Sequence, residues 1–155
     1  MLRFAWWLGF TLAGIWLQQG LAGVDFLAPG ILLAVQQERP VVAAWLALCW
    51  MFVQEGTGGL AFGYGFAWYG GLFLFIVIGR WLFDQKSFLF ACLTGLVLGA
   101  WHVALSMALG GLEELALSAS HLAVEGVMQA LLFPLTWWAA HSWYPERLKR
   151  HERPA

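Results

Sequence analysis

The chain has 155 residues, of which 61% are hydrophobic and 11% are charged, and its mean hydropathy is +0.72. Soluble domains carry roughly 25% charged residues, so this composition excludes a soluble fold that covers its own surface. It predicts an integral membrane protein, in which the net charge of −1 matters less than where each charge lies.

Six apolar segments follow one another along the chain. They cover residues 4–23, 26–35, 41–53, 63–79, 88–109 and about 119–143. A membrane-spanning helix needs about 20 apolar residues. The first, fourth, fifth and sixth segments are therefore predicted to be spanning helices, and the first is interpreted as an uncleaved anchor. The second and third are short, so we expect them to lie inside the bundle or to cross a thinned bilayer steeply.

The charged residues between these segments predict the topology. With six crossings and Met1 in the cytoplasm, every basic residue falls inside, which is the positive-inside pattern. The acidic residues of the opposite connections then fall outside: Asp25, Glu55, Glu113 and Glu114. Joining the two short segments into a re-entrant hairpin would instead move Arg39 outside or into the core, where an unpaired arginine is costly.

We therefore expect an all-α membrane protein, a six-helix transmembrane bundle with two short helices and both termini in the cytoplasm. Residues 1–143 would form a single transmembrane domain, and residues 144–155 a basic cytoplasmic tail. A Gly95-x-x-x-Gly99 pattern predicts a close-packing face on the fifth helix, without naming the neighbouring helix. Cys49 and Cys92 lie at different depths, so no disulfide is expected and both are predicted to be buried.

Polar residues gather in the outer half of the predicted bundle. His121, Glu125 and Gln129 are spaced four apart, so they share one face of the sixth helix. Other segments contribute further polar residues at a similar depth: Gln54, Glu55, His102 and Ser106.

Two roles are open for this cluster. A carboxylate within the membrane is expensive, so Glu125 is a candidate functional residue. Pairing with His102 would instead make it a structural tie, because interhelical hydrogen bonds commonly hold membrane helices together. A ligand pocket is the alternative. A metal or haem site is disfavoured, because no spacing is diagnostic and His102 and His121 differ in depth by roughly a turn. No cofactor is therefore predicted.

Enzyme motifs are absent from the sequence: it has no nucleotide-binding loop with its lysine, no paired-cysteine metal motif and no nucleophile elbow. A dyad of His102 and Glu125 would lack an obvious nucleophile. We therefore predict that the chain is not an enzyme.

The order of segments resembles the MreD family, the small inner-membrane component of the bacterial rod-shape machinery. A short apolar segment opens with Pro29 in "APGILLAV", and an apolar run ends in an acidic residue before a glycine-rich step in "VQEGTGGLAFG". Glu55 and Gly63 occupy the matching places, although the family usually carries aspartate where Glu55 stands. The last helix carries Gln129, then Pro134, and a basic tail follows.

The resemblance implies a non-enzymatic scaffold in the bacterial inner membrane that acts in cell elongation and peptidoglycan synthesis. Its implied partners are a single-span periplasmic organiser of the MreC type and, through it, the wall-synthesis enzymes and a cytoplasmic actin-like filament. No nucleic acid is expected as a partner. Apolar and small-residue helix faces would bind partner helices, with the acidic external loops and the basic tail as secondary contacts.

The architecture also looks similar to the membrane substrate-binding subunits of energy-coupling-factor vitamin transporters. That alternative implies an outer pocket for a vitamin-sized ligand at residues such as His102, His121, Glu125 or Glu55. It also implies a small-residue patch on the first helix, where Ala5, Gly9, Ala13 and Gly14 are found. Under either interpretation, we expect the glycine-rich step to dip into the outer face of the bundle and to bring Glu55 near Glu125.

Overall fold

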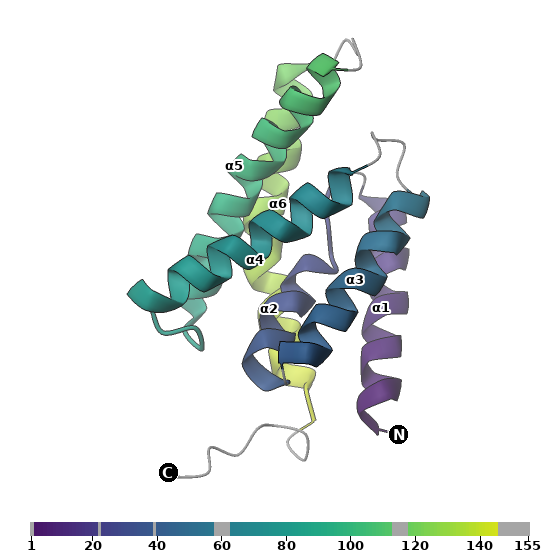
Figure 1. Ribbon diagram of the computed structural model, residues 1–155, viewed down its shortest axis with the longest axis vertical. Coiled ribbons are helices and arrows are strands. Elements are labelled where there is room, and N and C mark those ends of the chain that lie inside the picture. The colour runs from purple at the N-terminus through teal and green to yellow at the C-terminus, as the bar shows by residue number, and fades with distance from the viewer. Residues whose placement is uncertain (1, 22, 39, 58–62, 113–117, 146–155) are drawn as a thin grey trace.

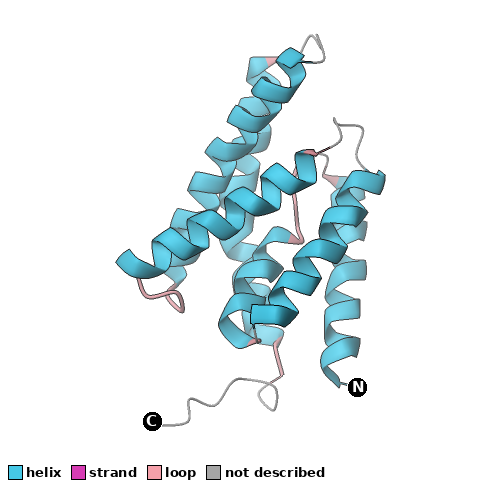
Figure 2. Ribbon diagram, in the orientation of Figure 1, coloured by secondary structure: helices cyan, strands magenta, loops and turns pink. Residues whose placement is uncertain are grey.

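The computed structural model describes residues 2–21, 23–38, 40–57, 63–112 and 118–145, and all regular structure in these ranges is helical (Figures 1 and 2). The helices are α1 (Leu2–Gly20), α2 (Ala28–Gln37), α3 (Pro40–Thr57), α4 (Tyr64–Leu82), α5 (Phe88–Leu112) and α6 (Ala119–Trp143). The prediction of an all-α fold with six helices is confirmed.

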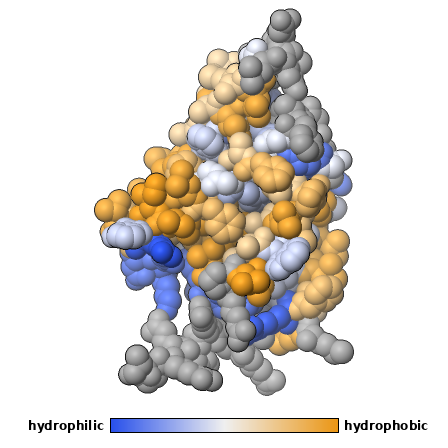
Figure 3. Space-filling model, viewed as in Figure 1, coloured by the Kyte–Doolittle hydropathy of each residue, from blue (hydrophilic) through white to orange (hydrophobic). Residues whose placement is uncertain are grey.

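Three helices in the described part of the chain, α4, α5 and α6, are long and apolar enough to cross a membrane. This indicates a membrane protein. Large apolar side chains face outward along the helices, and apolar residues cover much of the face seen in Figure 3. The first segment was also predicted to span, but α1 is not among these three helices.

The short second segment lies inside the bundle. Helix α2 has 10 residues, and its side chains are buried along nearly the whole length, between α3, α4 and α6. Pro29 stands in its first turn, where a missing backbone N–H costs nothing. The third segment is longer than expected: α3 continues through Gln54 and Glu55, so both belong to the helix.

Helices α5 and α6 form the most extensive helix pair (Figure 1). A Cβ atom on Gly99 would collide with the backbone carbonyl of Gly126, and one on Gly95 would lie 2.9 Å from the carbonyl oxygen of Ala130. Pro134 has no N–H to donate to that carbonyl, four residues earlier in α6. The neighbour that the glycine pattern left unnamed is therefore α6.

Two terminal segments and two connections were predicted to be cytoplasmic, and hydrogen bonds join their described residues in two groups. The start of α1 and the end of α6 lie close together, and Arg3 and Tyr144 both bind Glu38 at the end of α2. Gln36 of α2 binds the backbone of Gln85, between α4 and α5. Other residues used for the topology lie outside the described ranges: Arg39, Glu113, Glu114 and residues 146–155.

Both cysteines are free, which agrees with the expected absence of a disulfide. The prediction that both are buried is wrong, because Cys49 is exposed and Cys92 is partly exposed. In an apolar helix of a membrane protein an outward position is as apolar as an inward one, so hydrophobicity does not separate the two.

Candidate functional site

Asp25 is the centre of the most connected polar group in the described structure. It lies between α1 and α2 and is 8% exposed. Its Oδ1 accepts hydrogen bonds from the backbone N–H groups of Leu27 at 2.7 Å and Ala28 at 3.2 Å. A side-chain acceptor at this place satisfies donors that the first turn of a helix leaves free. The aspartate therefore fixes where α2 begins.

The same residue ties three further helices together. Its carboxylate accepts hydrogen bonds from Gln18 of α1 at 2.8 Å and from the Trp68 indole of α4 at 2.7 Å. Gln129 of α6 accepts from the Asp25 backbone N–H at 2.7 Å and donates to its carbonyl at 3.3 Å. We call Gln18, Asp25, Trp68 and Gln129 the Asp25 network. Asp25 lies in the connection between α1 and α2, as predicted, but its side chain is buried by these donors and is not the exposed loop contact that was expected. The side of the membrane on which it lies stays a prediction.

A second group joins α4, α5 and α6. Glu125 contacts the His102 Nε2 atom at 3.1 Å through one oxygen and the His121 Nδ1 atom at 3.1 Å through the other. The other ring nitrogen of His102 lies 2.9 Å from the Tyr64 hydroxyl. His102 is buried, whereas the side chain of His121 is 73% exposed. These four residues, the Glu125 network, form a continuous polar chain from the interior to the surface.

Gly23 allows Glu125 to occupy this position. Its backbone has a φ of +81°, which favours glycine, and a Cβ atom there would collide with the Glu125 carboxyl carbon. The connection between α1 and α2 therefore closes over the Glu125 side chain.

Glu55 binds the start of α4 and is not part of the Glu125 network. Its carboxylate accepts hydrogen bonds from the backbone N–H groups of Gly63 at 3.1 Å and Gly65 at 2.8 Å. Gly63 has a φ of +100°, which turns these N–H groups toward the carboxylate. No hydrogen bond in the described part of the chain joins Glu55 to Glu125. Most of the glycine-rich step, residues 58–62, lies outside the described residues, so its expected dip stays a prediction.

Two predicted site residues lie beside these networks. Gln54 is half-buried and lies near the Tyr69 hydroxyl of α4. Ser106 is 3% exposed and lies near the Tyr64 hydroxyl, outside hydrogen-bonding geometry. The structure thus brings His102, His121 and Glu125 together and places Ser106 beside them.

A third buried carboxylate lies at the opposite end of α2. Glu38 is 2% exposed and accepts hydrogen bonds from the Tyr144 hydroxyl at 2.7 Å and the Trp7 indole at 3.3 Å. Its other oxygen pairs with Arg3 at 3.2 Å. Burial, with the adjacent carboxylate, raises the pKa of the Tyr144 hydroxyl above its ordinary value, so this group stays a donor at neutral pH. We call Arg3, Trp7, Glu38 and Tyr144 the Glu38 network.

The chemistry available to these networks is hydrogen bonding and ion pairing within the bundle. Both nitrogens of His102, both oxygens of Glu125 and both oxygens of Asp25 have protein partners. Among the described residues, no group of three histidine, cysteine or acidic side chains could hold a metal ion. A surface groove of about 390 Å³ lies elsewhere, between α1 and α6, and contains none of these ionisable side chains.

Sequence reasoning missed the central roles of Asp25 and Glu38. For Asp25 a signal was present: an aspartate just before an apolar segment that begins with proline is typical of a helix start. For Glu38 no local signal exists, because its partners lie 31 or more residues away in the sequence.

Comparison with known proteins does not identify a relative: the chain matches no protein-family model, no curated protein and no solved structure.

Proposed function

We propose that this chain is a non-enzymatic membrane scaffold of the MreD type, a six-helix bundle in a bacterial inner membrane that acts in cell elongation. The observation that carries the proposal is the internal use of the buried polar groups. Asp25, Glu125 and Glu38 hold helices together, and their oxygens already have partners within the chain. Because the buried polar groups already have partners, the outward helix faces are the surface through which the chain would bind other proteins.

The positions behind the family resemblance support the same interpretation, because each has a task in helix assembly. Pro29 opens α2, Glu55 binds the start of α4 beside Gly63, and Gln129 holds the Asp25 backbone. Pro134 lies against Gly95 at the crossing of α5 and α6. The residues behind the resemblance therefore all lie at helix starts or helix contacts within the bundle.

The proposed partners bind through the outward apolar faces. Large aromatic side chains are strongly exposed on several helices: Phe4, Trp16, Trp81 and Trp143. Exposed apolar residues pack equally well against lipid and against a neighbouring helix, so van der Waals fit would select the partner. A single-span organiser of the MreC type is the expected partner, with wall-synthesis enzymes joined through it.

The test is affinity purification of the tagged chain from its host in mild detergent, followed by mass spectrometry of proteins and small molecules. We expect a single-span periplasmic coiled-coil protein and wall-synthesis enzymes to co-purify, and depletion of the chain to round rod-shaped cells. A transport ATPase with a bound vitamin, and unchanged cell shape on depletion, would contradict the scaffold.

The second candidate is a substrate-binding subunit of a vitamin transporter. One observation favours it: the small residues Ala5, Gly9 and Ala13 of α1 line an open groove, as a helix-docking patch would. Against it, the side chains that would bind the vitamin already have partners within the chain: Glu125 binds His102 and His121, and Glu55 binds backbone N–H groups. A vitamin recovered in a 1:1 ratio from the purified chain would favour this candidate.

A further inference from the structure

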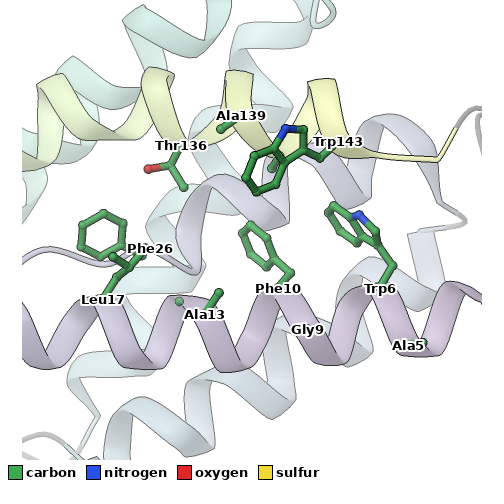
Figure 4. A pocket seen from close by; sticks show the side chains of 12 residues that line it. Ala5, Trp6, Gly9, Phe10, Ala13, Leu17, Phe26, Thr136, Ala139 and Trp143 are labelled. Carbon is green, nitrogen blue, oxygen red and sulfur yellow. The ribbon is translucent and has the colours of Figure 1, made fainter.

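An apolar surface groove runs between α1 and α6. Small residues of α1 line one wall, and Thr136 and Ala139 of α6 line the other (Figure 4). Trp6 and Trp143 lie at one end, and Leu17 and Phe26 at the other. Its lining is almost entirely apolar, and its volume is about 390 Å³.

This groove exists because α1 is fastened to the bundle at separate points. Hydrogen bonds hold it near both ends, to Glu38 and to Asp25, and Thr11 accepts a hydrogen bond from Trp50 of α3. Helix α1 is not part of any closely packed helix pair in the described structure. The side of α1 that faces α6 therefore stays partly open.

The dimensions fit a narrow apolar rod. Ala5 and Leu17 are twelve residues apart on α1, which corresponds to about 18 Å along the helix axis. One leaflet of a bilayer has a hydrocarbon thickness of about 15 Å. A helix about 10 Å across and 18 Å long occupies more than about 1,000 Å³. The groove volume is about 390 Å³, so a whole helix does not fit inside it. A single lipid acyl chain is long enough and thin enough.

Positive charge lies beyond the tryptophan end. Arg3 precedes Trp6 by one turn of α1, and its side chain is 55% exposed although it pairs with buried Glu38. Within the described structure that contact uses one of the nitrogen atoms of its guanidinium. Arginine has five donors in a geometry that matches phosphate. Tryptophan is common at the depth of lipid headgroups, and basic pockets between membrane helices bind anionic headgroups.

We propose that this groove binds one acyl chain of an anionic phospholipid, with Arg3 holding its phosphate. The acyl chain lies between α1 and α6, and the headgroup lies beside Trp6 and Trp143. The lipid fills the seam that protein side chains leave open. This site uses none of the residues behind the family resemblance, and it shares only exposed Trp143 with the aromatic side chains named above as partner-binding.

The test is native mass spectrometry of the full chain in detergent, titrated with phosphatidylglycerol or phosphatidylethanolamine. Gly9 lines the groove and a Cβ atom on it meets nothing within 4 Å, so Gly9→Leu adds apolar bulk to the groove at an open position. Gly70 of α4 is equally open and exposed, so Gly70→Leu is a matched control. We expect Gly9→Leu to weaken phosphatidylglycerol binding about tenfold, since displacing two methylene groups suffices for this. Gly70→Leu should leave binding unchanged.

Two further variants secure the result. Ala139→Leu fills the groove from α6 and should repeat the loss, and Arg3→Gln should abolish the preference for phosphatidylglycerol over phosphatidylethanolamine. Circular dichroism and size-exclusion chromatography report whether each variant is folded. Equal phosphatidylglycerol binding by folded Gly9→Leu, Ala139→Leu and the natural chain would overturn the proposal. Unchanged lipid binding with loss of a co-purifying membrane protein would also overturn it and assign the groove to a partner helix.

Discussion

The Asp25 and Glu38 networks keep a buried carboxylate in different ways. No cation in the described part of the chain pairs with Asp25: its carboxylate accepts hydrogen bonds from two backbone N–H groups, a glutamine amide and an indole. Glu38 has a tyrosine, an indole and one arginine, whose side chain is half-exposed. The difference follows from the surroundings. The Asp25 carboxylate lies where α1 ends and α2 begins, against the first turns of α4, and Gln129 in the middle of α6 binds its backbone. Glu38 lies where α1 begins and α6 ends.

This comparison shows how a membrane bundle tolerates charge. A cation beside Asp25 would itself have to be desolvated among the surrounding helices, so several neutral donors stabilise this carboxylate at lower cost. At the end of the bundle, an arginine reaches water or headgroups with part of its surface while it pairs inward. The Glu125 network lies between these cases, since it begins at buried His102 and ends at exposed His121.

The largest effect is expected for Asp25→Ala, which removes the acceptor shared by α1, α2 and α4. Because several buried donors lose their partner, we expect a loss of about 3 kcal/mol in the free energy of unfolding. Reversible unfolding in mixed micelles, followed by far-UV circular dichroism, measures it. Asp84→Ala, which removes an exposed carboxylate, is the control. A loss no larger than the control's would show that the neutral donors do not hold the bundle together.

A smaller effect is expected for Glu38→Ala, about 2 kcal/mol in the same measurement, because Arg3 recovers solvation once it is released. Trp7 and Tyr144 lose a buried partner. Glu38→Gln retains an acceptor for one of them and should lose about half as much. If Glu38→Ala lowers the free energy of unfolding more than Asp25→Ala does, the paired arginine contributes more to stability than the number of neutral donors. That result would contradict the predicted order of the two networks.

For Glu125→Ala we expect a loss of about 1 kcal/mol, since polar contacts between membrane helices are each worth roughly 0.6 kcal/mol. A double-mutant cycle with His102→Ala isolates their coupling energy. Thermal unfolding in detergent provides a second measurement. An unchanged melting temperature, together with loss of partner or ligand binding, would contradict the structural role and assign Glu125 to a binding site.

The smallest effect is expected for His121→Gln, below about 0.5 kcal/mol, because the imidazole is largely exposed and surface ion pairs contribute little. His102→Gln should cost more, since both ring nitrogens of His102 have partners in the bundle. Comparing the two variants by thermal unfolding at the same pH tests this gradient. Equal losses would mean that the exposed end of the Glu125 network is as important as its buried end.

The sequence identified part of this site correctly. Spacing of four placed His121, Glu125 and Gln129 on one helix face, and depth matched His102 to them. The sequence could not show that Gln129 belongs to a different network from His121 and Glu125, because its partner, the Asp25 backbone, is 104 residues away. No sequence signal indicated that Glu55 binds the backbone N–H groups at the start of α4, beside Gly63 with its positive φ. Its expected nearness to Glu125 stays a prediction.

Composition and periodicity alone determined the helical class, the number of helices and the membrane environment, because runs of apolar residues have few other stable arrangements. The tertiary structure decided which carboxylates are buried and what neutralises them. It placed Asp25 in the bundle, joined Glu38 to the start of α1 and the end of α6, and left a groove between α1 and α6. These outcomes depend on donors brought from distant segments, and no local pattern encodes the distance between them.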